Sequence, residues 1–273
     1  MPVPGVPVPE DCGTLRAMGE FVWSLLSTPR EPGQDGYFEH ARVELIDMLE
    51  RPPLRFVEIG CGAGSTGAEV KRRYPDCIVD GFEYSAAAAA IAATRMDHVH
   101  VGDVLDVDFA TIYAPAAIDA LLLADVLEHL YDPWLFLARI RPYLTLDAQI
   151  IASIPNVRNL ALLDEVAAGT FSYVPAGLLD ITHIRFFTRR EIEKMFDQTG
   201  YDITSMAGVR DERLGEPPSA GFPVDLETAS VRLKNLGPAD VFELYTIQFY
   251  LRVRRRPRRK GPSCRAICIR RSS

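Results

Sequence analysis

The spacing of apolar residues changes near residue 51, and from there short apolar runs alternate with segments of helical period. The apolar runs predict strands at 54–59, 77–83, 98–101, 118–124 and 148–154. The segments between them predict helices at 65–74, 85–96 and 132–144. Strands and helices that alternate at this rhythm form a parallel sheet covered on both faces. We therefore expect an α/β fold with a Rossmann-like, doubly wound and mostly parallel sheet.

Beyond residue 154 the pattern is different. Residues 155–187 form a long connection without strong periodicity, and 190–200 predicts a helix that Gly200 ends. Segments 201–208 and 241–253 have the character of strands that pair as an antiparallel C-terminal edge of the sheet. The stretch between them, 209–240, contains four prolines and predicts an irregular insertion.

The segments that flank the predicted sheet are less regular. A Pro-rich opening precedes two predicted helices, at 13–27 and 37–50. We therefore divide the chain into N-terminal helices or lid at 1–50, a main domain at 51–253 that carries the insertion, and a basic tail at 254–273. A block of like charges is usually solvated, so we expect the tail to be disordered and non-catalytic.

The stretch VEIGCGAGSTG (57–67) is a glycine-rich turn between a strand and a helix. Glycines at 60, 62 and 64 allow the backbone to approach a ligand closely, and the following helix directs its N-terminal N–H groups to the same place. Gly62, Gly64 and Gly67 also spell G-x-G-x-x-G, and Glu83 stands where a dinucleotide-binding fold places its ribose acid. The turn alone therefore leaves two classes of nucleotide-like ligand open.

Acidic residues at the ends of the strands favour one of these classes. Glu58 lies in the strand end, where its carboxylate would face an ammonium group, and Asp103 and Asp125 follow the third and fourth strands. Ligands of open α/β sheets bind at this carboxyl edge. Together with Glu83, these acids suit a cationic, amino-bearing and polyhydroxylated ligand and disfavour a diphosphate. The pattern favours S-adenosylmethionine over NAD or FAD.

These motifs resemble those of class I S-adenosylmethionine-dependent methyltransferases over residues 54–253. VEIGCGAG is similar to the first motif, GFEYS carries the ribose-binding acid, and VGDVLD carries the adenine-contacting pair. DVLEHLYDPW, ASIPNVRNL and DITHIRFFTRREIEKMF resemble a bacterial branch associated with glycan, sugar and secondary-metabolite methylation. The resemblance implies that 51–253 is a methyltransferase domain with S-adenosyl-L-methionine as its cofactor. The implied cofactor-binding residues are Glu58, Gly60, Cys61, Gly62, Gly64, Glu83, Tyr84, Asp103, Val104 and Asp125.

Candidate catalytic residues follow the fourth strand and the long connection. Methyl transfer to a hydroxyl needs a nearby group that removes its proton. His129 is our first candidate for this general base, because histidine titrates near neutrality, and His183 is the second. The alternative is that His129 braces its loop and that His183 anchors a lid. Asn156 and Arg158, just past the fifth strand, are candidate substrate contacts.

The same histidines admit a metal-binding interpretation. Glu128, His129 and His183, with Asp125 nearby, form an oxygen and nitrogen set suited to Mn²⁺ or Mg²⁺. Small-RNA 2′-O-methyltransferases resemble this arrangement, although metal-free relatives also carry the Glu-His pair. We favour a metal-free site and keep the divalent metal as an alternative.

Aromatic and histidine residues of the 37–50 helix are interpreted as core or as a cover of the pocket: Tyr37, Phe38 and His40.

The amino-acid composition disfavours some classes of binding partner. Residues 252–273 hold ten basic groups and no acid, so the remainder carries 20 basic groups against 37 acidic ones. An acidic body repels phosphates, which makes a nucleic-acid partner unfavourable. Five scattered cysteines predict reduced thiols and a cytoplasmic protein, and no apolar run approaches the ~18 residues of a membrane span.

The sequence therefore predicts a cytoplasmic biosynthetic enzyme that methylates a hydroxyl or amine of a small molecule, sugar, glycan unit or natural-product intermediate. An RNA methyltransferase that uses the basic tail, with or without a metal, is one alternative. A nicotinamide-dependent oxidoreductase is another, because of the G-x-G-x-x-G spacing. A non-catalytic cofactor-binding subunit has no feature in its favour. The oligomeric state is left open.

Overall fold

The computed structural model describes residues 41–257. The helix predicted at 13–27, the first residues of the helix predicted at 37–50, and the tail beyond 257 lie outside the described residues. The same holds for Tyr37, Phe38, His40, Cys12, Cys264 and Cys268. None of the helices within the described part has the length and apolar character needed to cross a bilayer.

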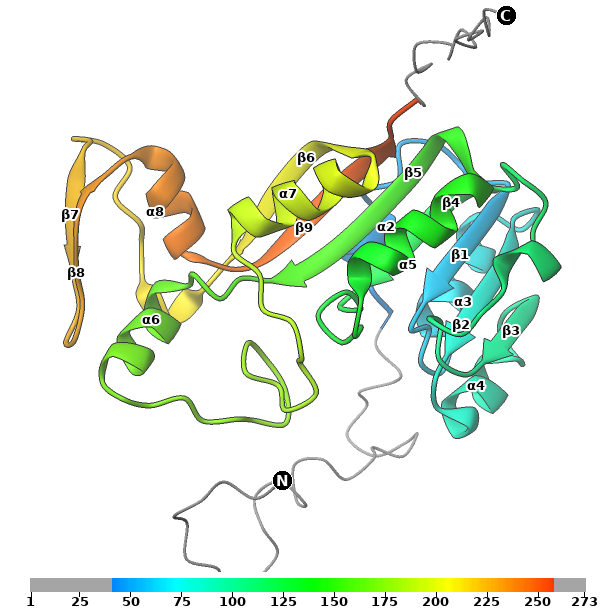
Figure 1. The fold of residues 1–273 in the computed structure, drawn as a ribbon, viewed down its shortest axis with the longest axis horizontal. Coiled ribbons are helices and arrows are strands. Elements are labelled where there is room, and N and C mark those ends of the chain that lie inside the picture. The colour runs from blue at the N-terminus through cyan, green and yellow to red at the C-terminus, as the bar shows by residue number, and fades with distance from the viewer. Residues whose placement is uncertain (1–40, 258–273) are drawn as a thin grey trace, which may run out of the picture.

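The described residues form one seven-stranded sheet in the order β3-β2-β1-β4-β5-β9-β6 (Figure 1). Its strands are β1 Arg55–Ile59, β2 Ile78–Glu83, β3 His98–Val101, β4 Ile118–Ala124, β5 Leu144–Pro155, β6 Tyr201–Arg210 and β9 Thr246–Arg255. Strands β1 to β5 pair in parallel, and β9 runs antiparallel between β5 and β6. The predicted α/β fold is confirmed, with the antiparallel strand one position inside the edge strand β6.

Helices cover both faces of the sheet (Figure 1). They are α2 Val43–Ile46, α3 Ser65–Arg73, α4 Ala86–Ala92, α5 Pro133–Ile140, α6 Leu160–Ala167, α7 Arg189–Thr199 and α8 Pro238–Leu244, with 3₁₀ turns at Phe109–Thr111, Arg141–Tyr143 and Glu212–Leu214. Because side chains alternate along a strand, Val57 packs with α5 and α7 whereas its neighbour Phe56 packs with α2, α3 and α4. The near-continuous apolar character of β4 follows from this double coverage.

Two segments have more structure than their sequence predicts. The connection 155–187 contains α6, whose N-cap residue Asn159 accepts hydrogen bonds from the N–H groups of Ala161 and Leu162. The predicted irregular insertion 209–240 contains a two-stranded antiparallel sheet of β7 Val224–Glu227 and β8 Arg232–Leu236. These elements and α8 share a small core of their own: Leu160, Leu226, Leu236, Val241 and Leu244.

The residue that ends α7 generates a stability prediction. Gly200 has φ +85°, and a Cβ there would lie 2.8 Å from Nε of Arg141. That nitrogen donates a 3.2 Å hydrogen bond to the carbonyl of Gly200, so it is not free to move away. We expect Gly200→Ala to lower the free energy of unfolding by about 1–2 kcal/mol from backbone strain, plus the loss of this bond.

Urea denaturation checks this prediction, with Gly169→Ala as the matched control. Gly169 has nearly the same φ of +87° but no atom within 4 Å of the added Cβ. Its variant therefore reports backbone strain alone. Equal losses in the two variants would contradict the role given to Arg141.

Candidate functional site

The glycine-rich turn lies at the carboxyl edge of the sheet, between β1 and α3. The backbone N–H groups of Gly60 and Cys61 both donate to the carbonyl of Phe82, at 2.8 and 3.1 Å, which fixes the turn against β2. Gly60, Gly62 and Gly64 all have positive φ, and Gly64 is the N-cap of α3. The turn therefore exposes backbone and a helix N-terminus at this edge, as the sequence predicts.

Glu83 closes the other side of the turn. Its two carboxylate oxygens accept hydrogen bonds from the backbone N–H groups of Gly62, at 2.8 Å, and Ser85, at 2.7 Å. A carboxylate oxygen can accept more than one hydrogen bond, so both oxygens keep capacity for ligand hydroxyls. Tyr84 beside it is 79% exposed. The pair thus combines a carboxylate of fixed orientation with an open aromatic surface.

Cys61 turns its side chain away from this edge. The thiol is buried in the core that contains Met96, and a Cβ on Gly81 would lie 2.6 Å from its Sγ. Burial is the first cause that raises the pKa of this thiol, and the carboxyls of Glu58 and Glu83 add to it. Cys61 therefore has its backbone in the turn, and its thiol is not poised to act as a reactive thiolate.

Glu58 is buried below the turn with one carboxylate oxygen that meets no hydrogen-bond donor among the described residues. Burial raises the pKa of this carboxyl to about 8; a hydrogen bond from Thr66 opposes the shift and the nearby Glu83 adds to it. A positively charged group placed beside Glu58 would restore its ionised form. The residue is thus suited to an ammonium group, as the sequence predicts.

Asp103 and Val104 follow β3 at the far end of the same edge. Asp103 is exposed, and its carboxylate accepts a 2.8 Å hydrogen bond from the N–H of Leu105. Val104 is 6% exposed and belongs to the main core. The carboxylate of the pair therefore faces solvent while the valine supports it from below.

Asp125 at the end of β4 is occupied by protein groups. Its carboxylate is bonded to Arg42, to Gln248 and to Oγ of Ser153, the last at 2.8 Å. The residue has φ +54°, in the left-handed region. Arg42 also donates its backbone N–H to Oγ1 of Thr66, at 3.2 Å, so one arginine connects the N-terminal segment, α3 and β4. This network orients the start of the loop that follows β4.

That loop brings together the candidate catalytic and metal-binding residues. Glu128, His129 and His183 each offer one potential ligand atom, and these atoms all lie within 4.8 Å of one another. The backbone N–H groups of Ile184 and Arg185 donate to the carbonyl of Glu128, at 3.0 and 2.9 Å. Residues 55 positions apart in the sequence thus form one cluster, which we call the Glu-His cluster.

Burial controls the charge of the Glu-His cluster. Glu128 is 1% exposed, and burial, with the charge of Asp125 as the next cause, raises the pKa of its carboxyl well above the usual range. Burial also lowers the pKa of His129, and the neighbouring His183 lowers it further. Both shifts favour the neutral forms of Glu128 and His129.

The loop that carries Glu128 and His129 packs against the glycine-rich turn. A Cβ on Gly60 would lie 3.2 Å from Cγ2 of Val126, so the loop after β4 lies directly against the turn. Parallel pairing of β1 with β4, with Ile59 opposite Leu123, places their carboxyl ends side by side. The cofactor candidates and the catalytic candidates consequently meet at the same edge.

The side chains of the two candidate substrate contacts, Asn156 and Arg158, bind other parts of the protein. Asn156 is completely buried, and its side-chain amide donates to the carbonyls of Glu243 and Thr246, at 2.8 and 2.9 Å. Arg158 pairs with Glu243 at 2.6 Å and with Asp240 at 3.0 Å. Both side chains attach α8 to the end of β5, and these bonds account for their polar groups without a substrate.

Some residues that contact the candidate site residues are not apparent from the sequence. Arg42 and Gln248 hold Asp125 from positions 83 and 123 residues away, so no local pattern reveals them. Thr182 contacts Nδ1 of His129 through both its carbonyl and its hydroxyl. It stands next to His183 within DITHIRFF, so that motif carries a signal for it.

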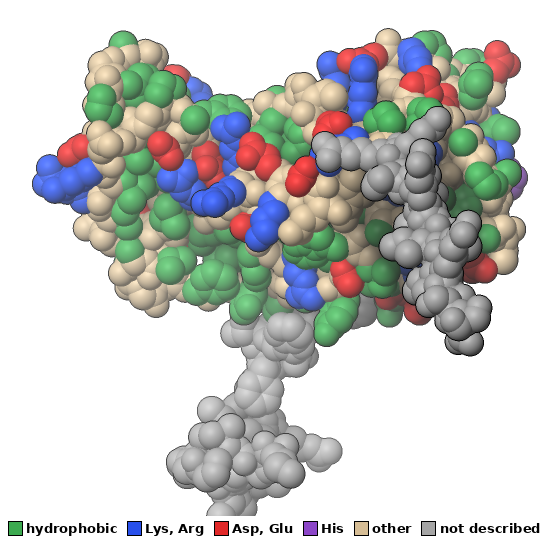
Figure 2. Space-filling view, turned by 45° about the horizontal axis from the view of Figure 1, so that its top comes forward, with side chains coloured by type: hydrophobic (Ala, Val, Ile, Leu, Met, Phe, Trp, Pro, Cys, Tyr) green, Lys and Arg blue, Asp and Glu red, His purple; other side chains and the backbone are tan. Residues whose placement is uncertain are grey.

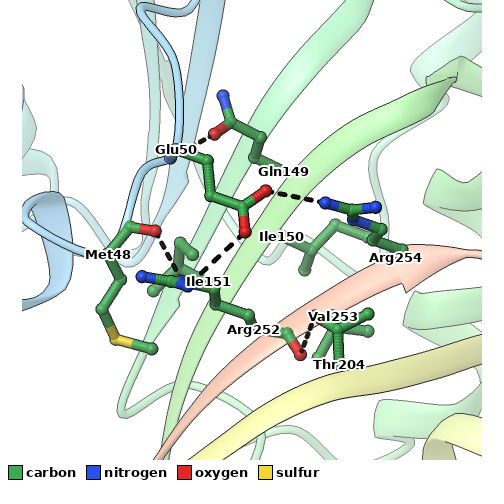
Figure 3. Close-up of a pocket in the computed structure, with 9 residues that line it drawn as sticks. All are labelled: Met48, Glu50, Gln149, Ile150, Ile151, Thr204, Arg252, Val253 and Arg254. Carbon is green, nitrogen blue, oxygen red and sulfur yellow. Dashed lines mark hydrogen bonds and ion pairs between the residues drawn. The ribbon is translucent and has the colours of Figure 1, made fainter.

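The pocket drawn in Figure 3 lies elsewhere, near the amino ends of the parallel strands. Glu50 there pairs with Arg254 at 2.7 Å and with Arg252 at 3.5 Å. Its backbone N–H donates to Gln149 at 2.6 Å. Both arginines of this pocket pair with Glu50, and none of its lining residues is a candidate site residue.

Comparison with known proteins identifies the family. A model of the family described as "Methyltransferase domain" matches residues 34–206, well over half of the chain. The chain belongs to this family and is an S-adenosylmethionine-dependent methyltransferase. The family implies S-adenosylmethionine as the cofactor. The predicted enzyme class is confirmed.

Two curated relatives differ in name. A ubiquinone biosynthesis O-methyltransferase of Nitrobacter winogradskyi is 28% identical over 180 residues, which is 63% of this chain and 66% of that protein. A ribosomal RNA small subunit methyltransferase C of Pseudomonas fluorescens is 39% identical over 83 residues, 26% of this chain. The chain spans a quarter of the length of this second relative and just under two thirds of the first.

A solved structure agrees with the fold. An S-adenosylmethionine-dependent methyltransferase of Thermotoga maritima, described as a possible histamine N-methyltransferase, superposes with a TM-score of 0.52 at 16% identity. The match covers 85% of this chain and 92% of that one. At this identity the likeness concerns the fold alone.

The buried Glu58 generates a prediction about protons. Its pKa of about 8 keeps the carboxyl protonated at pH 7 in the ligand-free protein. An ammonium group bound beside it lowers that pKa, so S-adenosylhomocysteine binding at pH 7 should release up to about one proton. The release should fade as the pH rises above 8, because the carboxyl is then already ionised.

Calorimetry in two pH 7 buffers of different ionisation enthalpy measures this release. The apparent binding enthalpy should differ between the buffers for the wild type and agree between them for Glu58→Gln. A wild-type enthalpy that is independent of the buffer would remove Glu58 from the ammonium site.

Proposed function

We propose that this methyltransferase acts on a hydroxyl or amine of a small molecule, such as a sugar or a natural-product intermediate, and that a hydroxyl is the preferred acceptor. The observation that carries this proposal is the contact between Gly60 and Val126, which puts the cofactor turn and the Glu-His cluster at one edge. The acceptor would bind on the β4 side, beside the cluster.

The residues of the edge fit the cofactor from one end to the other. Glu83 offers two oriented oxygens for ribose hydroxyls, and Asp103 with Val104 lies where a nucleobase would follow. Glu58 offers a buried oxygen without a donor for the ammonium group. When bound, S-adenosylmethionine supplies an activated methyl group on a sulfonium. With ribose at β2 and the amino-acid end at β1, the sulfonium lies toward β4.

The surroundings of the Glu-His cluster favour a small acceptor with an apolar part. Phe171 packs edge-to-face with Tyr173 and with Phe186, at centroid distances of 5.7 and 6.1 Å, and all three are partly exposed. Phe186 follows His183 by three residues, so this aromatic surface adjoins the cluster. Exposed aromatic groups beside polar catalytic groups are typical of small-molecule pockets.

A hydroxyl acceptor explains the cluster better than an amine. A neutral amine already carries a free lone pair, whereas a hydroxyl must lose its proton to become a good nucleophile. A group of two histidines and one carboxyl beside the acceptor serves only the second case. The relative named as a ubiquinone biosynthesis O-methyltransferase is consistent with this choice.

An RNA acceptor is the second candidate, because the chain shares a short region with ribosomal RNA methyltransferases. The charge distribution is against it. On the face that Figure 2 shows, acidic side chains lie among the basic ones instead of forming a separate area. Phosphate-binding surfaces need clustered positive charge.

We predict that Glu83→Gln weakens S-adenosylhomocysteine binding by about 1–3 kcal/mol, because a neutral amide loses the charge-assisted bonds to ribose. Calorimetry gives the affinity, and circular dichroism checks the fold. Glu193→Gln is the matched control, since Glu193 pairs with Arg189 on the outer surface of α7. Unchanged affinity in Glu83→Gln would exclude Glu83 from the cofactor site.

We also predict that phenolic or sugar hydroxyls accept labelled methyl groups and that their rate changes little between 50 and 200 mM salt. Ribosomal RNA methylation, if it were the function, should fall by orders of magnitude over that range. A variant that ends at residue 257 tests the basic tail. Small-molecule activity should survive this truncation, whereas robust RNA methylation that the truncation abolishes would contradict the proposal.

A further inference from the structure

The Glu-His cluster has an unusual buried carboxyl. Glu128 is 1% exposed, and neither of its carboxylate oxygens accepts a hydrogen bond from another of the described residues. A buried carboxyl without a partner is expensive, whether it is charged or neutral, and native proteins contain few such groups. Nε2 of His183 lies 4.0 Å from Oε1 of Glu128, which is too long for a hydrogen bond. A ligand bound by both the Glu128 carboxyl and the His183 imidazole would give the buried carboxyl a partner.

Both histidines are held so that Nε2 is their free acceptor. Nδ1 of His183 lies 3.1 Å from the carbonyl oxygen of Leu178, and Nδ1 of His129 lies 3.2 Å from that of Thr182. A carbonyl only accepts, so each Nδ1 carries the proton and each Nε2 keeps a lone pair. Histidines that bind metal ions are oriented in this manner, with the other ring nitrogen donating to a carbonyl.

Thr182 reinforces this assignment. Its hydroxyl donates to the carboxylate of Asp180, at 2.6 Å, and therefore has no proton left for His129. At 3.1 Å from Nδ1 of His129 it must act as an acceptor, which again places the ring proton on Nδ1. Asp180, Thr182 and His129 thus form a chain that fixes one tautomer.

The three potential ligand atoms are close enough to share an ion after local adjustment. Ligand bonds from histidine nitrogen or carboxylate oxygen to a divalent ion are about 2.0–2.2 Å, so two ligands of one tetrahedral ion are about 3.4 Å apart. The three atoms of the cluster lie within 4.8 Å of one another. Rotations of the side chains that shorten these separations by up to about 1.4 Å would place all three atoms on one ion.

We propose that Glu128, His129 and His183 bind a divalent first-row transition-metal ion of the Mn²⁺ class. Two imidazoles and one carboxylate favour such an ion over Mg²⁺ and Ca²⁺, which prefer ligand sets of oxygen alone. Three protein ligands leave coordination positions open for a substrate oxygen. His129 is then a ligand and not the general base, because its Nε2 lone pair cannot serve both roles.

The catalytic consequence rests on the function proposed above. The ion would lower the pKa of the acceptor hydroxyl, whose proton passes to water. An oxygen lone pair then forms the bond to the methyl carbon while the carbon–sulfur bond breaks and its electron pair stays on sulfur, giving S-adenosylhomocysteine. The ion changes no oxidation state, so no further reactant is needed.

The test is Mn²⁺ binding to the full chain after removal of metals with a chelator and dialysis. Electron paramagnetic resonance and calorimetry should find about one ion per chain, and Mn²⁺ should raise the melting temperature. Glu128→Gln and His183→Ala should lose this binding. Thr182→Val keeps the ligands but removes the hydroxyl that orients His129, and its affinity should fall by roughly 10-fold.

His98→Ala is the matched control. His98 also lies beside a buried acid, with Nδ1 at 2.8 Å from Asp80, but it belongs to β3 and is not part of the Glu-His cluster. Its variant should bind Mn²⁺ as the wild type does. Absence of Mn²⁺ binding in the wild type, or equal binding in Glu128→Gln and the wild type, would overturn the proposal.

Methyltransferase assays distinguish failure of the metal-site proposal from failure of the proposed function. A chelator-treated enzyme that still methylates a small hydroxyl acceptor at full rate, but is inactivated by His129→Ala, would overturn the ion and retain the function with His129 as a free base. An enzyme that binds Mn²⁺ at the cluster yet methylates only RNA would overturn the proposed acceptor and retain the ion site. Activity that the chelator removes and Mn²⁺ restores supports both.

Discussion

Parallel pairing of β1 with β4 is the constraint on which the site depends. It brings the strand ends at Ile59 and Ala124 to one edge, and the missing side chain of Gly60 lets Val126 lie against the turn. A larger residue at position 60 would strain the backbone at φ +70° and would press against the side chain of Val126 in the loop after β4. The glycine therefore serves two purposes, because it allows a left-handed backbone and also sets the distance between the cofactor turn and the Glu-His cluster.

Charge at this edge follows from the same geometry. Five acids converge there, and the protein itself satisfies only some of them. Arg42 and its neighbours hold Asp125, and backbone N–H groups hold Glu83. Glu58 and Glu128 are left buried with unbonded oxygens and raised pKa values. A buried acid without an internal partner becomes favourable when a ligand brings positive charge, so these two positions are where a cationic ligand gains most.

What the sequence predicts well is local or periodic. The strands follow from apolar runs, and the glycine turn with Glu83 follows from a spacing that one strand–helix–strand unit determines. Contacts between distant segments are harder to predict. Nothing local pairs Arg42 with Asp125, and Asn156 looks polar and available until its amide is seen to tie α8 to β5. The hairpin of β7 and β8 is hard to predict because it buries few side chains and because prolines flank it at positions 223 and 238.

The small core of α6, α8, β7 and β8 supports the segment that we associate with acceptor choice without belonging to the cofactor edge. Asn156 and Arg158 attach this core to the end of β5, and α6 leads from it into the 168–188 segment that carries the aromatic surface and His183. That segment contains little regular structure of its own, and its last part is fixed to the main domain where Ile184 and Arg185 donate to Glu128. A loop held at both ends can vary in sequence between its anchors without disturbing the cofactor edge. Under the proposed function, acceptor identity is therefore best sought in residues 168–186, while the chemistry of transfer depends on the geometry of β1 and β4.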